Sequence, residues 1–361
     1  MADTALATGL RVQQWDSKFF LEYLTENRYA GEMGTNENSI IQLREDVSKK
    51  PGDSITFALV NKLTNQAVTG SNVLEGNEED MTTRSFRLYV DKRRNAIRIP
   101  EMEQVKSPID LRNAARSILK EWALKDTEGL ISNGLMGING VNFLVANATQ
   151  KNTWLGYNSD RVLFGAVKSN NTGTFSTSLA NIDTTADKLG AAGLSQMKRI
   201  AIAANPRVRP VRVEGGGAKR WYTVHVNSAS FRDLKGDATI TQAQREVRLE
   251  AQNSKLFEGG DIVWDGMIVK ETPDLDQFIT VNTNSVACGP VILCGAQAIG
   301  AAYAKRWTSQ TKTFDYGDKF GVATEAIYGV KKLEFGTGQG DTDSPKDNGV
   351  VTGWFAAAPD A

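Results

Sequence analysis

The sequence has little of the side-chain chemistry that enzymes and metal sites use. Its 361 residues include one histidine, His225, and two cysteines, Cys288 and Cys294. These counts exclude a histidine-rich metal site and a disulfide framework. Lys and Arg together number 42, and so do Asp and Glu. The chain therefore has no overall basic field to hold nucleic acid and no acidic field to repel it.

Long apolar runs are also missing. No segment approaches the roughly 18 apolar residues of a membrane span, and residues 1–4 do not begin a signal peptide. We expect synthesis as a soluble protein in a reducing, intracellular compartment, with Cys288 and Cys294 as small buried hydrophobic residues. Hydrophobic residues make up 40% of the chain, enough for a core of ordinary size.

What the sequence does contain is a long ribbon with little support of its own. Residues 54–63 and 84–90 alternate apolar and polar side chains as strands do. Nothing predicts a fold for the connecting residues 64–83, and a structureless loop of about twenty residues is unusual inside a compact domain. An isolated two-stranded ribbon is at best marginally stable in water. We infer that the ribbon rests on something outside its own subunit, which indicates an assembly protein.

The ribbon carries opposite charges in neighbouring segments. The acidic residues are Glu75, Glu78, Glu79 and Asp80. The basic residues are Arg84, Arg87, Lys92, Arg93, Arg94 and Arg98. Such an arrangement suits contacts that set the register between copies of one subunit, so these residues are the candidate inter-subunit contacts. A solvated ribbon face is the alternative, while a metal site is disfavoured because such sites need fixed geometry.

The N-terminal half predicts an arm, the ribbon and one strong helix. Residues 1–50 form the arm, with a short helix at 15–27. The strong helix covers 107–133, with Ser107 as N-cap and Pro108 at the first position. At about 1.5 Å per residue it would be roughly 35 Å long. Its predicted apolar stripe consists of Leu111, Ala115, Ile118 and Trp122.

The rest of the chain predicts a mixed α+β order without internal repeats. Residues 140–182 show no clear period. Helices are predicted at 184–205, 239–253 and, from Ala-rich composition, 295–305. Strands are predicted at 221–226, 261–269 and 291–294. Residues 324–358 alternate strand-like segments with a loop at 336–341.

Two motifs that occur in enzyme sites stand here in unfavourable contexts. The glycine turn at 215–220 precedes a strand, and no Ser or Thr follows Lys219, so a hairpin turn is favoured over a phosphate-binding loop. His225 alternates with apolar strand residues, where a lone histidine is usually structural. A second basic patch suits a subunit contact, a solvent face or a nonspecific nucleic-acid surface. It comprises Lys198, Arg199, Arg207, Arg209, Arg212, Lys219 and Arg220.

An ordered set of motifs along nearly the whole chain resembles the major capsid proteins of tailed bacteriophages. The similarity is greatest to those of the N-four-type podoviruses. Its N-terminal motifs are Trp15, Phe19, Glu22-Tyr23, and the segments 31–34 (GEMG), 51–57 (PGDSITF), 68–70 (VTG) and 74–79 (LEGNEE). Its later motifs are 231–235 (FRDLK), 261–269, 295–298 (GAQA), and 314–317 (FDYG) through 331–332.

The resemblance implies the Hong Kong 97-type α+β fold. The expected parts are an arm at 1–50, an extended β-ribbon loop at 51–105, a peripheral domain at 106–184 with spine helix 107–133, an axial domain at 185–300, and a return to the peripheral domain at 301–361. The implied function is structural, without catalysis, cofactor or metal. Such a major capsid subunit self-assembles as hexamers and pentamers into an icosahedral shell around packaged phage dsDNA.

The resemblance also implies partners. These are further copies of the chain, a portal, a scaffolding protein that is separate because no long charged helical segment precedes the arm, and optional decoration proteins. DNA would be contacted nonspecifically at most, and no membrane is involved. Assembly would take place in the bacterial host cytoplasm, and the product would lie in the virion capsid. Two alternatives stay open: a non-viral compartment of the same fold that loads protein cargo, and a small nucleotide-binding enzyme.

Overall fold

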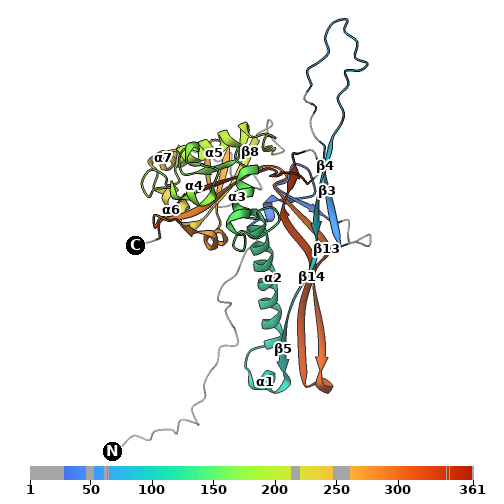
Figure 1. The fold of residues 1–361 in the computed structure, drawn as a ribbon. Helices are drawn as coiled ribbons and strands as arrows, with labels where there is room; N and C mark the ends of the chain where they lie inside the picture. The colour runs from blue at the N-terminus through green and yellow to red at the C-terminus, as the bar shows by residue number, and fades with distance from the viewer. Residues whose placement is uncertain are drawn as a thin grey trace, which may run out of the picture. The chain divides into compact units, whose positions relative to one another are not determined.

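The computed structural model describes residues 28–45, 53–60, 63, 65–212, 220–246, 261–338, 340 and 342–359 (Figure 1). These residues divide into two compact units. The first unit comprises 92–127 and 305–327, and the second comprises 28–91, 128–304 and 328–361 within the described ranges. The helix predicted at 15–27 and most of the glycine turn at 215–220 lie outside the described residues.

The first unit holds the short helix α1 (Glu101–Lys106) and parts of longer elements that continue along the chain into the second unit. These longer elements are β5 (Asp91–Pro100), α2 (Leu111–Leu135), β13 (Ile299–Phe314) and β14 (Lys319–Lys332). The turn η7 (Asp315–Gly317) joins β13 to β14. These strands belong to a five-stranded sheet of order β1-β2-β13-β14-β5. Within the unit, Trp122 of α2 packs edge-to-face on Trp307 of β13, with ring centroids 5.7 Å apart.

The second unit is built on a sheet of eight strands. Its order is β6-β17-β12-β8-β10-β9, with β11 beside β12 and β7 beside β8. The strands are β6 (Val162–Phe164), β7 (Val211–Arg212), β8 (Arg220–Val226), β9 (Ile262–Trp264), β10 (Met267–Glu271), β11 (Thr280–Val281), β12 (Ala287–Cys294) and β17 (Val350–Ala356). β12 runs antiparallel to both β8 and β17, whereas β10 runs parallel to β8.

Helices and shorter strands complete the second unit. The helices are α3 (Ala148–Tyr157), α4 (Phe175–Ala180), α5 (Ala191–Ala203), α6 (Ser228–Lys235), α7 (Ala238–Glu246), and the 3-10 helices η2 (Ala30–Glu32), η4 (Lys168–Asn170) and η6 (Pro273–Phe278). The remaining strands are β1 (Met33–Gly34), β2 (Ile41–Arg44), β3 (Ser54–Val60), β4 (Thr83–Tyr89), β15 (Glu334–Gly336) and β16 (Pro345–Asp347). Local sequence fixes several starts: Asn147 and Gln150 form a reciprocal capping box on α3.

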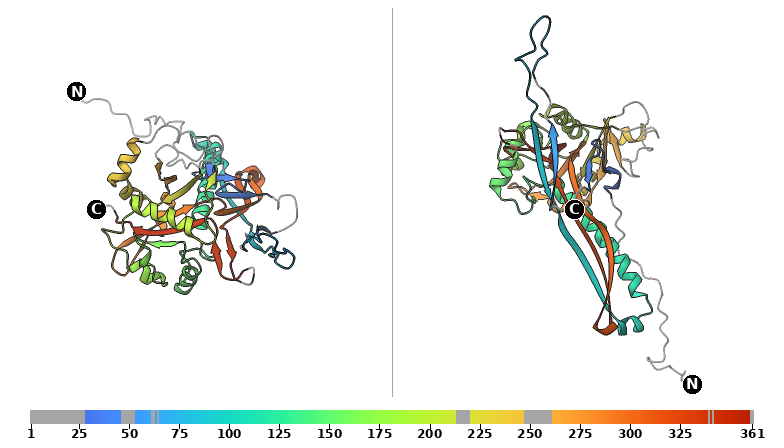
Figure 2. Two further views of the ribbon diagram at one scale, coloured as in Figure 1. Left: turned by 90° about the horizontal axis from the view of Figure 1, so that it is seen from above. Right: turned by 90° about the vertical axis from the view of Figure 1, so that its right-hand side faces the viewer.

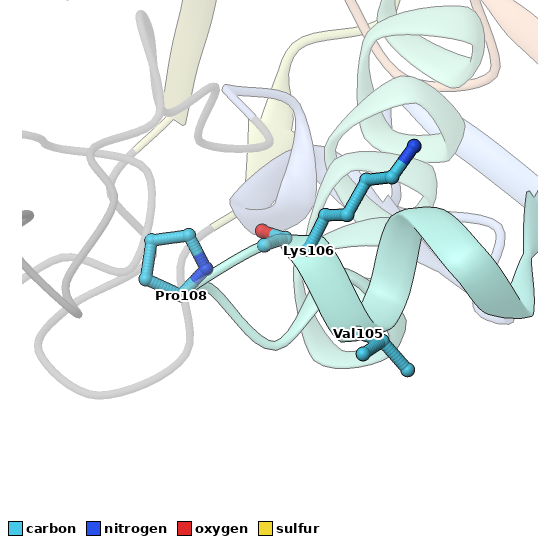
Figure 3. A pocket seen from close by; sticks show the side chains of 4 residues that line it. Val105, Lys106 and Pro108 are labelled. Carbon is cyan, nitrogen blue, oxygen red and sulfur yellow. The ribbon is translucent and has the colours of Figure 1, made fainter. Parts of the chain in front are cut away.

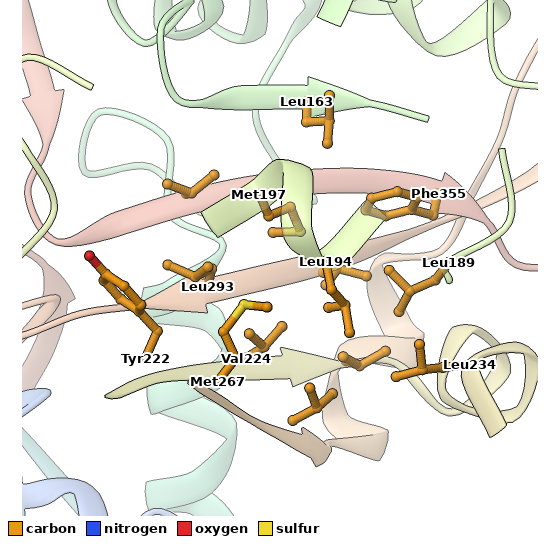
Figure 4. Close-up of a cluster of buried hydrophobic side chains, with 14 of the residues drawn as sticks. Leu163, Leu189, Leu194, Met197, Tyr222, Val224, Leu234, Met267, Leu293 and Phe355 are labelled. Atoms are coloured by element: carbon orange, nitrogen blue, oxygen red, sulfur yellow. The ribbon is translucent and has the colours of Figure 1, made fainter. Parts of the chain in front are cut away.

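The main core lies between one face of the eight-stranded sheet and helices α5, α6 and α7. Leu194 and Met197 of α5 point toward Val224 and Leu293 of the sheet (Figure 4). All are buried, and each such side chain contributes about 1.5–3 kcal/mol relative to exposure. The intervening strand residues, such as His225, are buried on the other face. Burial on both faces explains why the strands read as nearly continuous apolar runs.

Most of the predicted strands are confirmed. β3 and β4 reproduce the two ribbon strands, and β8 and β12 cover the strands predicted at 221–226 and 291–294. The strand-like segments of 324–358 are β14 to β17. The helix predicted at 184–205 is present but shorter, as α5. The helix predicted at 239–253 is present as α7 up to residue 246, and residues 247–253 lie outside the described chain.

The strong helix is present with different ends, and its buried face matches the predicted stripe only in part. α2 spans Leu111–Leu135, and Ser107 is the C-cap of the unpredicted α1 with an extended backbone, the conformation that Pro108 imposes on the residue before it. Asp110 instead accepts hydrogen bonds from the first-turn amides of α2. Ile118, expected on the apolar stripe, is 46% exposed. The buried row consists of Ala115, Leu119, Ala123, Thr127 and Ile131.

Two further predictions are wrong for identifiable reasons. The Ala-rich segment 295–305 is not a helix but leads into β13, where small residues permit close packing. A Cβ at Gly300 would lie 2.8 Å from Leu333 and 2.9 Å from Phe57. The single strand predicted at 261–269 is the hairpin of β9 and β10, because Asp265 and Gly266 both adopt positive φ and form its turn. Sequence patterns also missed α3, α4, α6 and β6.

Candidate assembly interface

The predicted ribbon is present and ends in a long loop. β3 and β4 pair antiparallel, from Ser54 opposite Tyr89 to Val60 opposite Thr83. Residues 65–82 between them contain no helix or strand. Figures 1 and 2 show this loop extending past the ends of both strands and away from the eight-stranded sheet. The loop is therefore a surface that its own unit does not cover.

Several large apolar side chains of this loop are exposed. Val73 is 67% exposed, Leu74 61% and Met81 70%. At the ribbon end, Val60 and Leu63 are 57% and 66% exposed. Scattered apolar residues are normal on protein surfaces, whereas a concentration of them in one segment marks a contact with another molecule. These exposed side chains make the loop a candidate for contact with another protein molecule.

The base of the ribbon, in contrast, is packed. Phe86 of β4 meets Phe335 of β15 edge-to-face, with ring centroids 6.4 Å apart. The guanidinium of Arg84 donates to the carbonyl oxygens of Gly338 and Gly340, at 2.6 and 2.7 Å. The buried cluster at the base contains Ile55, Phe57, Leu88, Ala302, Leu333 and Phe335. A fixed base thus holds an uncovered loop.

The four candidate acids all lie in the loop. Glu75, Glu78 and Asp80 are exposed, and Glu79 is half-buried. Oε2 of Glu78 accepts from the amide of Gly76 at 2.7 Å, and Oε2 of Glu79 accepts from the amide of Asn65 at 2.7 Å. Glu78 and Glu79 therefore stabilise the backbone conformation of the loop. Their pairing with a neighbouring subunit stays a prediction.

The six candidate basic residues divide into engaged and exposed groups. Besides Arg84, Arg93 makes a two-point contact with Asp126, at 2.6 and 2.5 Å. Lys92 lies 3.0 Å from Glu325, which Lys305 also contacts. Hydrogen bonds from these two lysines outweigh desolvation and lower the pKa of Glu325 to about 2.

The other three basic residues are exposed. Arg87, Arg94 and Arg98 all lie at the surface. Arg98 is near Asp315, where it adds to the larger effect of Lys319 in lowering the pKa of that carboxyl group. The three exposed arginines are therefore the better candidates for contacts with another subunit.

His225 lies in a buried ion cluster rather than in a catalytic cleft. Its Nε2 is 3.0 Å from Oε2 of Glu32, and Oε1 of Glu32 is 3.4 Å from Nζ of Lys270. Its Nδ1 lies 3.2 Å from the hydroxyl of Thr272. Burial alone would raise the pKa of Glu32, but the charges and hydrogen bonds of His225 and Lys270 hold it below its usual value. The cluster fits the structural role predicted for His225.

The described chain offers little to bind a metal or a small substrate. Among the residues that the structure describes, no group of three or more His, Cys, Asp or Glu side chains is arranged to hold a metal ion. An open hollow beside α1 is lined by Val105, Lys106, Ser107 and Pro108 (Figure 3). Lys106 is the one charged residue of this lining, and Figure 3 shows it pointing away from Val105 and Pro108. The hollow lacks the converging polar groups of a catalytic site.

The second basic patch is partly engaged within the chain. Nζ of Lys198 contacts Oδ1 of Asp265 at 2.7 Å, whereas Lys219 lies outside the described residues. Arg212 and Arg220 are direct cross-strand partners in β7 and β8. The exposed members are Arg199, Arg207, Arg209, Arg212 and Arg220. Whether the patch binds a subunit or nucleic acid stays a prediction.

Sequence reasoning missed two buried charged groups, namely Glu32 beside His225 and Glu334 opposite Asp347. Glu32 and His225 are 193 positions apart, so no local spacing joins them. Glu334 and Asp347 face each other across the hairpin of β15 and β16. The sequence offered one signal for this pair. Glu334 and Asp347 both stand in strand-like segments, where charged residues are rarely buried without partners.

Comparisons with known proteins agree on one family. A family model described as phage capsid protein matches residues 3–357. The major capsid protein of Pseudomonas phage KPP25 is 27% identical over 364 residues, covering 90% of this chain and 89% of that protein. The capsid asymmetric unit of cyanophage Pam1 matches with a TM-score of 0.87 at 31% identity over 100% of both chains. The capsid of Ralstonia phage GP4 shares the fold, with a TM-score of 0.76 at 22% identity over 100% of both chains.

The fold and the family match define a structural protein that forms shells. The chain belongs to the phage capsid protein family. It is a major capsid subunit of a bacteriophage with the Hong Kong 97-like α+β fold, part of an icosahedral shell and not an enzyme. No helix among the described residues is long and apolar enough to cross a membrane.

Proposed function

We propose that the β3–β4 ribbon and its loop are the element by which one capsid subunit holds a neighbouring copy within a hexamer or pentamer. The exposed apolar side chains Val73, Leu74 and Met81 carry this proposal, because their own unit leaves them uncovered. Burying a large apolar side chain contributes about 1.5–3 kcal/mol. A neighbouring subunit that covers the loop would thus supply the stability that an isolated ribbon lacks.

Charge complementarity would set the register of this contact. The loop acids would meet basic residues of a neighbouring subunit, and Arg87, Arg94 and Arg98 are exposed for that purpose. Each exposed ion pair contributes only about 0–1 kcal/mol. A shell repeats every contact many times, so even weak pairs shift the concentration at which assembly begins.

The proposal also assigns a structural part of the capsid fold to each segment of the chain. Residues 1–50 would act as the arm, 51–105 as the extended loop, 106–184 as the peripheral domain with the spine helix, 185–300 as the axial domain, and 301–361 as the return to the peripheral domain. The long helix α2 supports the spine-helix assignment. Strands β8 to β12 of the eight-stranded sheet fall within the proposed axial range, whereas β6 and β17 of the same sheet come from the proposed peripheral ranges.

The partners follow from the same role. We place the chain among the N-four-type podovirus capsid proteins, assembling in the bacterial cytoplasm with a portal and a separate scaffolding protein, and with decoration proteins as a further option. Packaged dsDNA would be contacted nonspecifically. The motifs at 31–34 and 51–57 support the subfamily.

Replacing residues 65–82 by a short turn tests the role of the ribbon. We expect a folded, soluble subunit that no longer forms closed shells, because the deletion removes uncovered surface and leaves the packed base intact. Electron microscopy would detect shells, and circular dichroism would confirm folding. Particles of normal size from the deleted protein would refute the proposal.

A matched variant separates the apolar contact from the length of the loop. Val73, Leu74 and Met81 are replaced by Ser in the full-length loop. If apolar burial drives the contact, this variant should require a higher subunit concentration to assemble. Replacing the exposed Asn72 by Ser, in the same loop, is the control and should leave the threshold unchanged.

A further inference from the structure

The hairpin of β15 and β16 places two acidic residues directly opposite each other. Glu334 of β15 is the register partner of Asp347 in β16. Glu334 is 7% exposed and Asp347 1%. Like charges in directly opposed strand positions repel each other and weaken the pairing of the strands. The hairpin is therefore most stable when the pair carries one proton.

The groups around the pair compensate one negative charge. Nζ of Lys332 lies 2.7 Å from Oδ2 of Asp347, and the indole N–H of Trp154 donates to the same oxygen at 3.1 Å. The guanidinium of Arg161 donates to the backbone carbonyl of Asp347. Oδ1 of Asp347 has no hydrogen-bond partner within the described part of the chain. The buried pair holds two carboxyl groups against one buried ammonium group.

Glu334 is the member of the pair that takes up the proton. Burial and the neighbouring Asp347 raise the pKa of Glu334 to about 7, against the opposing effects of Lys332, the amide of Gly140 and Lys331. Glu334 also lines a hollow of about 180 Å³, together with Gly140 and Lys331. The hollow gives the carboxyl group a short route to exchange its proton with solvent.

The same hairpin holds the base of the ribbon. Phe335, the residue after Glu334, packs on Phe86 of β4. The turn that joins β15 to β16 supplies the carbonyl oxygens of Gly338 and Gly340 to which Arg84 of β4 donates. Separation of β15 from β16 would disturb both contacts together.

We propose that the Glu334–Asp347 pair is a proton-operated clamp on the base of the β3–β4 ribbon. With one proton on the pair, β15 and β16 stay paired and hold Arg84 and Phe86. When the pair loses this proton, repulsion between the two carboxylates loosens the hairpin and frees the ribbon to move. The clamp operates within one subunit, so its existence does not depend on the proposed role of the ribbon. Its importance for assembly does rest on that role.

The direction of the pH dependence follows from linkage. The closed clamp binds the proton more tightly than the open one, so its stability is greatest in acid and is lost as pH rises from about 4.5 to about 7. If the open state restores the ordinary pKa of 4.5, the opening equilibrium rises about thirtyfold between about pH 5.5 and about pH 8.

Amide hydrogen exchange of β3 and β4 in the unassembled full-length subunit tests this clamp. After correction for the intrinsic pH dependence of exchange, protection of these amides should fall about thirtyfold over that range. Glu334→Gln keeps the shape of the side chain without the charge and should make protection independent of pH. Glu75→Gln, at an exposed acid of the loop, should retain the wild-type profile.

Each outcome decides the proposal. A flat profile in the wild-type protein overturns it, even if Glu334→Gln fails to fold. A pH dependence that survives in Glu334→Gln overturns it as well, because another group would then be responsible. Assembly by the variant lacking 65–82 would refute the ribbon contact while leaving this exchange profile untouched, so the two proposals fail separately.

Discussion

Removal of the buried charge of Glu32 should be among the most damaging single substitutions in the second unit. The carboxylate is fully buried and faces His225 at 3.0 Å and Lys270 at 3.4 Å. In Glu32→Gln, the negative charge that faces Lys270 and His225 disappears while the shape of the side chain stays. Breaking a buried ion pair by removing one partner costs about 3–5 kcal/mol.

That cost is large relative to the stability of an ordinary domain, about 5–15 kcal/mol. We expect the denaturation midpoint of the unassembled Glu32→Gln subunit at neutral pH to fall well below that of the wild type. Glu37→Gln changes an exposed acid of the same segment and should leave the midpoint unchanged. The double variant Glu32→Gln/Lys270→Met should recover part of the loss, because the buried ammonium is then absent as well.

The pH dependence gives a second check on the same cluster. The pKa of Glu32 is held below its usual value, so its contribution is present above about pH 4.5 and is lost as pH falls through the lowered pKa. The gap between wild type and Glu32→Gln should therefore narrow in strong acid. A gap that stays constant as pH falls, or a midpoint equal to that of Glu37→Gln, would refute the argument.

Three further variants test other parts of the chain. Trp122→Ala should lower the melting temperature, because it removes the contact with Trp307. The loss of folding stability should stay below the roughly 3–5 kcal/mol that truncation of a fully buried tryptophan costs, since Trp122 is only half-buried. Lys120→Ala, at an exposed position, should melt like the parent, and the reverse order would show that the packing face of α2 is misassigned. Gly329→Ala should reduce the yield of folded subunit, because its Cβ would lie 2.1 Å from the carbonyl oxygen of Tyr89; a normal yield would contradict this. Light scattering at several salt concentrations should show weaker and less salt-sensitive assembly when the loop acids become Ser, and an unchanged salt dependence would count against the ion pairing. The acids replaced in this variant are Glu78, Glu79 and Asp80.

The ribbon could be predicted from sequence because its signals are local. The alternation in 54–63 and 84–90 and the unpatterned segment between them are properties of neighbouring residues. The same local reasoning failed at 295–305, where Ala and Gly suggested a helix. There the small residues make room for Phe57 and Leu333 against a strand, a tertiary demand that outweighs helix propensity.

Long-range contacts set the limit of prediction at the candidate site. The basic residues of the ribbon were recognised by type, but their engagement depends on distant partners such as Asp126 and Glu325. Glu32 meets His225 only because the chain folds across 193 positions. The turn at Asp265 and Gly266 is different, since an Asp-Gly pair between apolar runs is a recognised hairpin signal.

The two native cysteines can be used to detect local opening of the eight-stranded sheet. Cys288 and Cys294 are both fully buried in β12. Burial raises the pKa of Cys288 to about 12 and holds the pKa of Cys294 well above its usual value. The thiolate is the form of cysteine that reacts with a thiol reagent, so both sulfur atoms stay unreactive while β12 remains paired in the sheet. In a shell of many identical subunits, the amount of reagent incorporated would count the subunits whose central sheet has opened, without any engineered label.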